Sequence, residues 1–319
     1  MKPNRKFVMA AVTAACLTTA MLRAQTPAAP QAPTMEGYPA VGSPSVVKVI
    51  AAGAEPRKAL RYAVPAGFKG RMDMTMSIGI NANVGGMAIP MNLPSLKMTA
   101  DLGVTGVAPN GDTSYTLAFS GVTVDAAGGE ANPMMATALQ GMQSAITGIK
   151  GTSTISNRGL VKSAKIDAAN SPEAQQMLGE LTSQIENLAT PFPEEAVGVG
   201  AKWETRQAMK TAGQFIFQKI TTEVVSIEGS TVKLKLTTEQ TVPAQAFTNS
   251  MLPPGTDISL DGGKGTGSGT MAIRLDSLIP TGESSIVSSM SMTINMGGQS
   301  QPMSMENTVK MTIAPGPVK

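Results

Sequence analysis

The feature that most constrains this chain is a strict alternation of apolar and polar residues. Residues 71–80 show it most clearly, because every second position is apolar. These positions are Met72, Met74, Met76, Ile78 and Ile80. Successive side chains of a strand point to opposite faces, so the pattern predicts a half-buried strand. Burial on one face only is typical of antiparallel sheets, whereas parallel strands are covered on both faces.

The same alternation recurs along the chain, in residues 96–104, 115–119, 232–236, 290–296 and 303–313. Turn residues separate many of these segments, and such residues between strand-like runs indicate hairpins. The turn sequences are Pro109-Asn110-Gly111-Asp112, Asn157-Arg158-Gly159 and Glu228-Gly229-Ser230. We therefore expect a mainly antiparallel β protein.

Two segments have helical rather than alternating spacing of their apolar residues, residues 134–149 and 172–188. Pro133 and Pro172 stand where a helix begins, a position that proline favours. The predicted fold class is therefore mainly β (α+β). We expect about ten or eleven strands in one strongly curved antiparallel sheet or open barrel, with both amphipathic helices on the concave face.

The chain also contains a weak internal repeat. Met74-Thr75-Met76-Ser77-Ile78 resembles Met290-Ser291-Met292-Thr293-Ile294, and each is followed by Gly-Gly and Pro-Met. Two explanations remain open, a duplication or two similar hairpins at opposite edges of one sheet. We accordingly expect residues 58–319 to form a single β-rich domain, with two similar halves, 58–190 and 191–319, as the alternative. Residues 25–57 are rich in proline and alanine and predict a flexible tether.

The first 24 residues have the order expected of a secretory signal peptide. Lys2, Arg5 and Lys6 precede an uncharged apolar run, and Ala24 offers a small residue for cleavage. The sequence therefore predicts an exported protein, periplasmic or secreted. The alternative is lipid anchoring at Cys16, because the residues before it partly resemble a bacterial lipobox.

Cleavage after residue 24 would change the charge of the chain. Removing four basic residues from the 25 Lys and Arg leaves 21 against 22 acidic residues, a net charge of −1. A near-neutral protein lacks the basic surface that nucleic acids require, so we expect no nucleic-acid partner. No later segment offers about 18 consecutive apolar residues, so we expect no membrane span in the mature chain.

The sequence excludes several chemistries. It has no His, and its single Cys16 lies in the predicted leader. Ser-His and Cys-His catalysis and ordinary zinc sites are thereby removed, and we expect no enzyme, metal or cofactor. Glu194-Glu195 fits a solvated loop. The glycine-rich residues 262–269 lack the Ser or Thr that follows the lysine of a phosphate loop, so they predict a flexible hairpin or edge loop. Asp257, Asp261 and Asp276 are too scattered for a calcium loop.

Methionine is unusually frequent, with 23 in the chain and 20 after the leader. Flexible, polarizable thioethers suit surfaces that re-pack around varied apolar partners. One interpretation is a ligand-binding face for a lipid, an acyl chain or a hydrophobic peptide, and the other is ordinary core filling. Copper(I) binding is disfavoured because these methionines lie in an apolar pattern. The candidate ligand-binding residues are Met72, Met74, Met76, Met98, Met290, Met292, Met303 and Met305.

Several stretches resemble an uncharacterised family of secreted bacterial proteins with a domain of unknown function. They are the Met-rich first strand, residues 151–159, residues 191–203, which end in Trp203, and the glycine-rich run ending in Leu275-Asp276-Ser277-Leu278. This resemblance implies fold and export only. The order of elements is also similar to that of Lol-type periplasmic lipoprotein carriers, although no motif supports that likeness. We expect a non-catalytic exported protein that binds or carries an apolar ligand. The alternative is a structural or envelope-interaction protein with a fully packed core.

Overall fold

The structure is a computed structural model that describes residues 32–125, 147, 149–167, 189–211, 214–247, 256–296 and 299–317. Apart from Ala32, all of these residues belong to one compact unit, Pro33–Lys319. No helix among the described residues has the length and hydropathy needed to cross a membrane.

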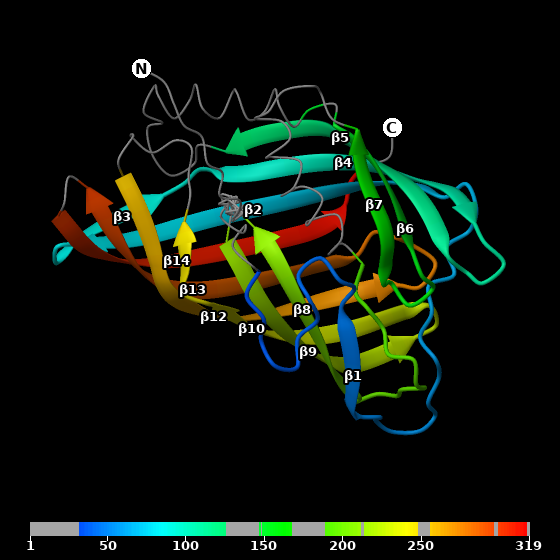
Figure 1. Ribbon diagram of the computed structural model, residues 1–319. Coiled ribbons are helices and arrows are strands. Elements are labelled where there is room, and N and C mark those ends of the chain that lie inside the picture. The colour runs from blue at the N-terminus through cyan, green and yellow to red at the C-terminus, as the bar shows by residue number, and fades with distance from the viewer. Residues whose placement is uncertain are drawn as a thin grey trace, which may run out of the picture. The chain divides into compact units, whose positions relative to one another are not determined.

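The described residues form one open antiparallel sheet of 14 strands. The main path is β1-β8-β9-β10-β12-β13-β14-β2-β4-β5-β6-β7, while β11 pairs with β12 and β3 with β2. Long strands such as β2, β13 and β14 lie side by side in Figure 1. The strands are β1 (Val46–Ala51), β2 (Lys69–Val84), β3 (Met87–Asn92), β4 (Ser95–Val107), β5 (Thr113–Asp125), β6 (Lys150–Ile155), β7 (Val161–Asp167), β8 (Lys202–Thr211), β9 (Gln214–Glu228), β10 (Thr231–Val242), β11 (Gln245–Phe247), β12 (Thr256–Arg274), β13 (Thr281–Met296) and β14 (Gln299–Pro315).

The predicted antiparallel pairing is confirmed, but the predicted fold class is wrong. The described residues are all-β, with no helix and more strands than the ten or eleven expected. The two segments with helical spacing, residues 134–149 and 172–188, lie outside the described residues except for residues 147 and 149. Residues 46–51, which we had assigned to the tether, form β1 and pair with β8. This difference arises because Val46, Val47, Val49 and Ile50 favour a strand despite the Pro/Ala-rich sequence around them.

The predicted turns are confirmed. Gly111, Gly159 and Gly229 connect β4 to β5, β6 to β7 and β9 to β10, and their φ angles are 83°, 79° and 59°. A positive φ carries little cost for glycine because it has no Cβ. The repeated hairpins do not occupy opposite edges of the sheet. Instead, β14 pairs directly with β2, and Met305 lies opposite Ala82.

The glycine-rich run is a further correction, because it is neither a hairpin nor an edge loop. It forms the middle of β12, which has β10 on one side and β13 on the other. Lys264, Thr266 and Ser268 are exposed on its outer face. The opposite face carries glycines at alternate positions, Gly263, Gly265, Gly267 and Gly269. The alternation is present, but its inward residues have no side chains and so give no apolar signal.

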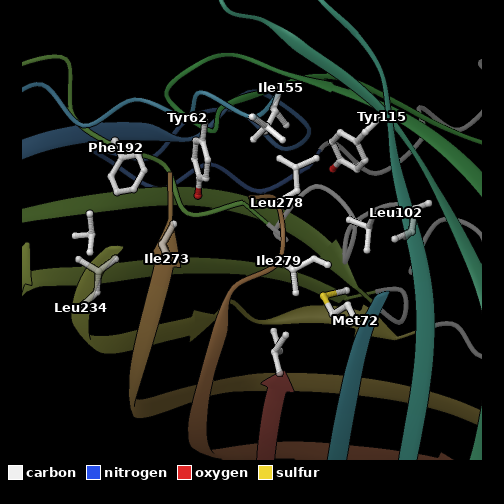
Figure 2. Close-up of a cluster of buried hydrophobic side chains, with 14 of the residues drawn as sticks. Tyr62, Met72, Leu102, Tyr115, Ile155, Phe192, Leu234, Ile273, Leu278 and Ile279 are labelled. Carbon is white, nitrogen blue, oxygen red and sulfur yellow. The ribbon is translucent and has the colours of Figure 1, made fainter. Parts of the chain in front are cut away.

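One large apolar cluster, the aromatic core, fills one end of the sheet's inner face. It combines strand residues with residues from connecting segments, and Trp203 is fully buried in it. The Phe192 ring lies 5.2 Å from the Tyr62 ring and 6.2 Å from the Trp203 ring, measured between centroids. Figure 2 shows Tyr62, Phe192 and Leu278 beside strand residues such as Met72 and Leu234. Connecting segments therefore seal this end.

Candidate functional site

The sheet curves so that one face is concave (Figure 1) and borders a cavity of about 520 Å³. Residues of β7, at one end of the strand order, and of β8, near the other end, line the same cavity. Residues 41–45 and 189–191 complete its wall. The apolar part of the lining includes Met209, Ile220, Leu236, Met271, Ile286 and Met311.

Glycine on β12 creates space in the cavity wall. Gly267 lies between Thr238 of β10 and Ile286 of β13, and both of these neighbours line the cavity. A Cβ on Gly267 would lie 2.6 Å from the Ile286 Cγ1 and 2.6 Å from the Ser285 carbonyl oxygen. Ile286 therefore leans over the bare backbone of β12. The missing side chains also allow neighbouring strands to bend closely around this position.

A row of residues that are polar apart from Gly265, which we call the polar belt, crosses the concave face. Its members are neighbours because the strand registers align them, and two contacts join them. Ser45 Oγ donates to Gln207 Oε1 at 3.1 Å, and Gln240 Nε2 donates to Gln218 Oε1 at 2.7 Å. From β8 to β14 the paired positions are Gln207, Gln218, Gln240, Gly265, Ser288 and Asn307, and Ser45 extends the row beyond β8.

The polar belt separates two apolar regions. On one side lies the aromatic core, and on the other lies a smaller cluster, the methionine cluster. Val242, Leu260 and Met292 are its buried members. Ile216, Ile258, Met290, Met303 and Met305 pack against them and are partly buried. The cavity reaches the belt at Ser45, Gln207 and Gln218.

Two lysines lie beside the cavity. Among the residues described as lining it, only Lys162 and Lys210 are ionisable. Lys162 forms an ion pair with Asp112, and this hydrogen bond is the main reason that the pKa of Asp112 lies below its usual range. The Lys210 Nζ lies 5.3 Å from the centre of the Phe215 ring. Outer-face pairs such as Lys219 with Glu239, at 2.8 Å, do not reach the cavity.

No group of three His, Cys, Asp or Glu residues in the described part of the chain could hold a metal ion. Burial raises the pKa values of Tyr62 and Tyr115, so both phenols stay protonated at neutral pH. What the cavity offers chemically is mainly apolar contact and neutral hydrogen bonding, with the ammonium groups of Lys162 and Lys210 beside it.

The eight methionines predicted from the sequence fall into two groups. Met72 and Met98 are buried in the aromatic core, and Met74 packs against it. Met290, Met292, Met303 and Met305 belong to the methionine cluster. Met76 lies opposite Met311 and is partly buried.

None of these eight residues is among the described lining of the cavity. The methionines that line it are Met209, Met271 and Met311. Sequence reasoning placed Met311 on an apolar face but did not select it. It missed the belt glutamines, whose alternation with Arg206, Lys219 and Glu239 was the available signal.

The sequence matches no protein-family model and no curated protein. The resemblance to an uncharacterised secreted family therefore remains a prediction that rests on the stretches quoted above.

Proposed function

We propose that this protein is a non-catalytic, exported binding protein that holds an apolar, chain-like ligand in the cavity on its concave face. The observation that carries this proposal is the 520 Å³ cavity, whose described lining is apolar or neutral apart from Lys162 and Lys210. Its volume lies within the range of about 300–1,000 Å³ that is usual for small-molecule sites. Export in the proposal rests on the signal-like residues 1–24, with lipid anchoring at Cys16 as the alternative.

The lining explains why an apolar chain would bind. Met209, Met271 and Met311 come from three different strands and border the same space. Methionine has three rotatable bonds and a polarizable sulfur, so these side chains can adapt to ligands of different shape. Leu236 and Ile286 add branched apolar surface. Removing such surface from water by covering it with an alkyl chain is favourable.

The rival function is that of a structural or envelope-interaction protein whose core simply contains a void. This rival predicts no saturable binding of apolar molecules. It also predicts that filling the cavity stabilises the protein without changing any other property, because empty space forfeits packing contacts. Ligand binding and its loss on filling therefore distinguish the two functions.

The decisive experiment measures binding of the uncharged apolar fluorophore N-phenyl-1-naphthylamine. The full chain is isolated from the periplasm, and native mass spectrometry first identifies any lipid that co-purifies. We expect one-to-one saturable binding and a higher Tm with the fluorophore, since a ligand of the folded state stabilises that state. Absence of both effects in delipidated protein would refute the proposal.

A matched pair of variants locates the site. Ser284 lines the cavity, whereas Ser268 is exposed on the outer face of the neighbouring strand β12. We expect Ser284→Leu to weaken fluorophore binding about tenfold or more, because its side chain occupies ligand space. Ser268→Leu should bind as the wild type does. Equal binding by all three proteins would place the ligand elsewhere and overturn the assignment.

A further inference from the structure

The polar belt indicates which hydrogen-bonding groups the ligand has, whereas the apolar walls indicate only that part of it is apolar. Its residues share the inward face of their strands with cavity-lining residues such as Met209, Ile220 and Ile286, so their side chains point toward the concave face. Gln207 is 8% exposed. A core with no polar role would place apolar side chains there, because burying an amide requires a hydrogen-bond partner.

At the β14 end of the belt, one side-chain oxygen has no hydrogen-bond donor among the described residues. Gln207 and Gln218 accept from Ser45 and Gln240, respectively. Asn307 Oδ1 is buried, and no donor among the described residues reaches it. An amide oxygen only accepts hydrogen bonds, so its missing partner is a hydroxyl or an N–H group. Buried acceptors of this kind in native proteins call for a specific explanation.

The surroundings of the belt also restrict the charge of that partner. The inward positions of β8, β9, β10, β12, β13, β14 and β2 carry no ionisable side chain among the described residues. An ionised head group at the belt would lose its hydration without gaining a counter-charge. Of the two lysines beside the cavity, Lys162 is already paired with Asp112, and the Lys210 Nζ lies 5.3 Å from the centre of the Phe215 ring.

From these observations we infer that the ligand is an uncharged amphiphile, an alkyl chain with a hydroxyl or amide N–H group, whose head lies at the polar belt. Long-chain alcohols, monoacylglycerols and fatty amides belong to this class. The chain lies against the apolar wall that includes Leu236, Met271 and Met311. Asn307 is not among the lining residues, but it lies on β14 with Met311, which lines the cavity. The head extends past Met311 to the belt, where it donates to Asn307 Oδ1. This inference rests on the proposed function, because it requires that the cavity binds a ligand.

The test is displacement of N-phenyl-1-naphthylamine by three competitors with the same chain, decan-1-ol, decyl methyl ether and decanoate, at pH 8. The ether lacks the hydrogen-bond donor, and decanoate is ionised. We expect decan-1-ol to displace the fluorophore at about tenfold lower concentration than either competitor, since one hydrogen bond to a buried acceptor corresponds to roughly that factor. Equal potency of alcohol and ether, or a preference for decanoate, would overturn the inference.

Two variants on β14 provide the internal control. Asn307→Leu removes the buried acceptor, while Ser304→Leu changes an exposed position on the opposite face of the same strand. We expect Asn307→Leu to lose the preference for alcohol over ether, measured as the ratio of the two concentrations that displace the fluorophore. Its Tm without ligand should equal or exceed that of the wild type, because the unsatisfied oxygen is gone. Ser304→Leu should keep the preference.

The two proposals fail in distinguishable ways. If the fluorophore does not bind at all, the proposed function is wrong and this inference falls with it. If the fluorophore binds but Asn307→Leu retains the full alcohol preference, the cavity binds ligands and only the role of the belt is wrong. A purely structural Asn307 would change the Tm but leave the competitor ranking as it is in the wild type.

Discussion

The aromatic core and the methionine cluster occupy the same concave face but differ in what covers them. Leu60, Phe192 and Trp203 are 0% exposed in the aromatic core, and the first two come from segments outside the strands. In the methionine cluster, Met290, Met303 and Met305 remain partly exposed among the described residues. The same sheet therefore has one end that is sealed by rigid rings and another that is lined by flexible thioethers.

The aromatic core is suited to stabilising the folded protein, whereas the methionine cluster is suited to adapting its shape. Rigid aromatic side chains lose little freedom when they pack, and they contribute large buried areas. Methionine fills irregular space but specifies a single packing less strongly. We expect the sealed end to dominate the free energy of unfolding, while the belt and cavity between the two clusters govern binding. Substitutions in each region test this division.

The largest effect is expected at Trp203, in the sealed end. Trp203→Ala removes a fully buried ring and the hydrogen bond from its Nε1 to the Pro191 carbonyl, 3.2 Å long. We expect a loss of about 3–5 kcal/mol in the free energy of unfolding, measured by urea denaturation. Trp203→Phe, which keeps much of the ring, should cost less. A loss below about 1 kcal/mol for Trp203→Ala would show that this end does not dominate stability.

A methionine pair compares the two clusters with the same substitution. Met72 is 1% exposed in the aromatic core, whereas Met305 is partly exposed in the methionine cluster. We expect Met72→Ala to cost about 2–4 kcal/mol and Met305→Ala about 1 kcal/mol, because the second site loses less buried surface and relaxes more easily. Urea denaturation of both variants gives the difference. Equal losses would remove the distinction between the clusters.

The third prediction concerns the glycine strand between the two clusters. A Cβ on Gly267 would approach the Ser285 carbonyl oxygen to 2.6 Å, a contact that backbone must move to relieve. We expect Gly267→Ala to destabilise the protein by about 1–3 kcal/mol. Ser268→Ala, on the exposed face of the same strand, should change stability by less than about 0.5 kcal/mol. Thermal unfolding of both variants tests the effect, and a neutral Gly267→Ala would mean that bare backbone is not required there.

Strand β12 also shows which strands a hydrophobic pattern can and cannot predict. Strands β2 and β4 were predictable because methionine, leucine and valine mark their inward positions. On β12 the inward positions of residues 263–269 are glycines. The alternation is therefore present but has no apolar side chains to reveal it, and the sequence predicts a loop there instead. The turn at Gly111 was predictable because asparagine and glycine have local conformational preferences that need no tertiary context.

The sequence predicts which side of the strands is apolar, but it does not predict which residues line the cavity. Alternation placed methionines on one side of the strands, which the register confirms for Met76 and Met311. Which methionines border the cavity depends on strand order and curvature, and those are set by pairings between distant segments such as β14 with β2. Met209 and Met271 were therefore missed. No local sequence pattern predicts that β7 and β8 line the same cavity.

The smallest expected effect concerns Asp112, which pairs with Lys162 beside the cavity. The hydrogen bond from Lys162 lowers the pKa of Asp112, and one from Asn110 Nδ2 adds to this shift. The folded state thus binds the Asp112 proton more weakly than the unfolded state does. The pair's stabilisation is present above the unfolded pKa of about 3.9 and disappears as the pH falls through the lower folded pKa. Since Lys162 is half exposed, we expect Asp112→Asn to cost less than about 1 kcal/mol at pH 7. This difference from the wild type should shrink as the pH falls through the lowered folded pKa of Asp112.

Asp112→Asn also tests the role of charge in binding, because it changes the charge beside the cavity and alters no residue of the aromatic core or the methionine cluster. Asp112→Asn leaves Lys162 without its carboxylate partner, so the cavity gains an uncompensated positive charge. We expect the variant to bind decanoate more tightly relative to decan-1-ol than the wild type does, while fluorophore affinity stays within about twofold. Added salt should reduce the gain, because Lys162 is half exposed. An unchanged ranking of the two competitors at low salt would show that Lys162 does not influence the ligand, and the neutral preference would then depend on the polar belt alone.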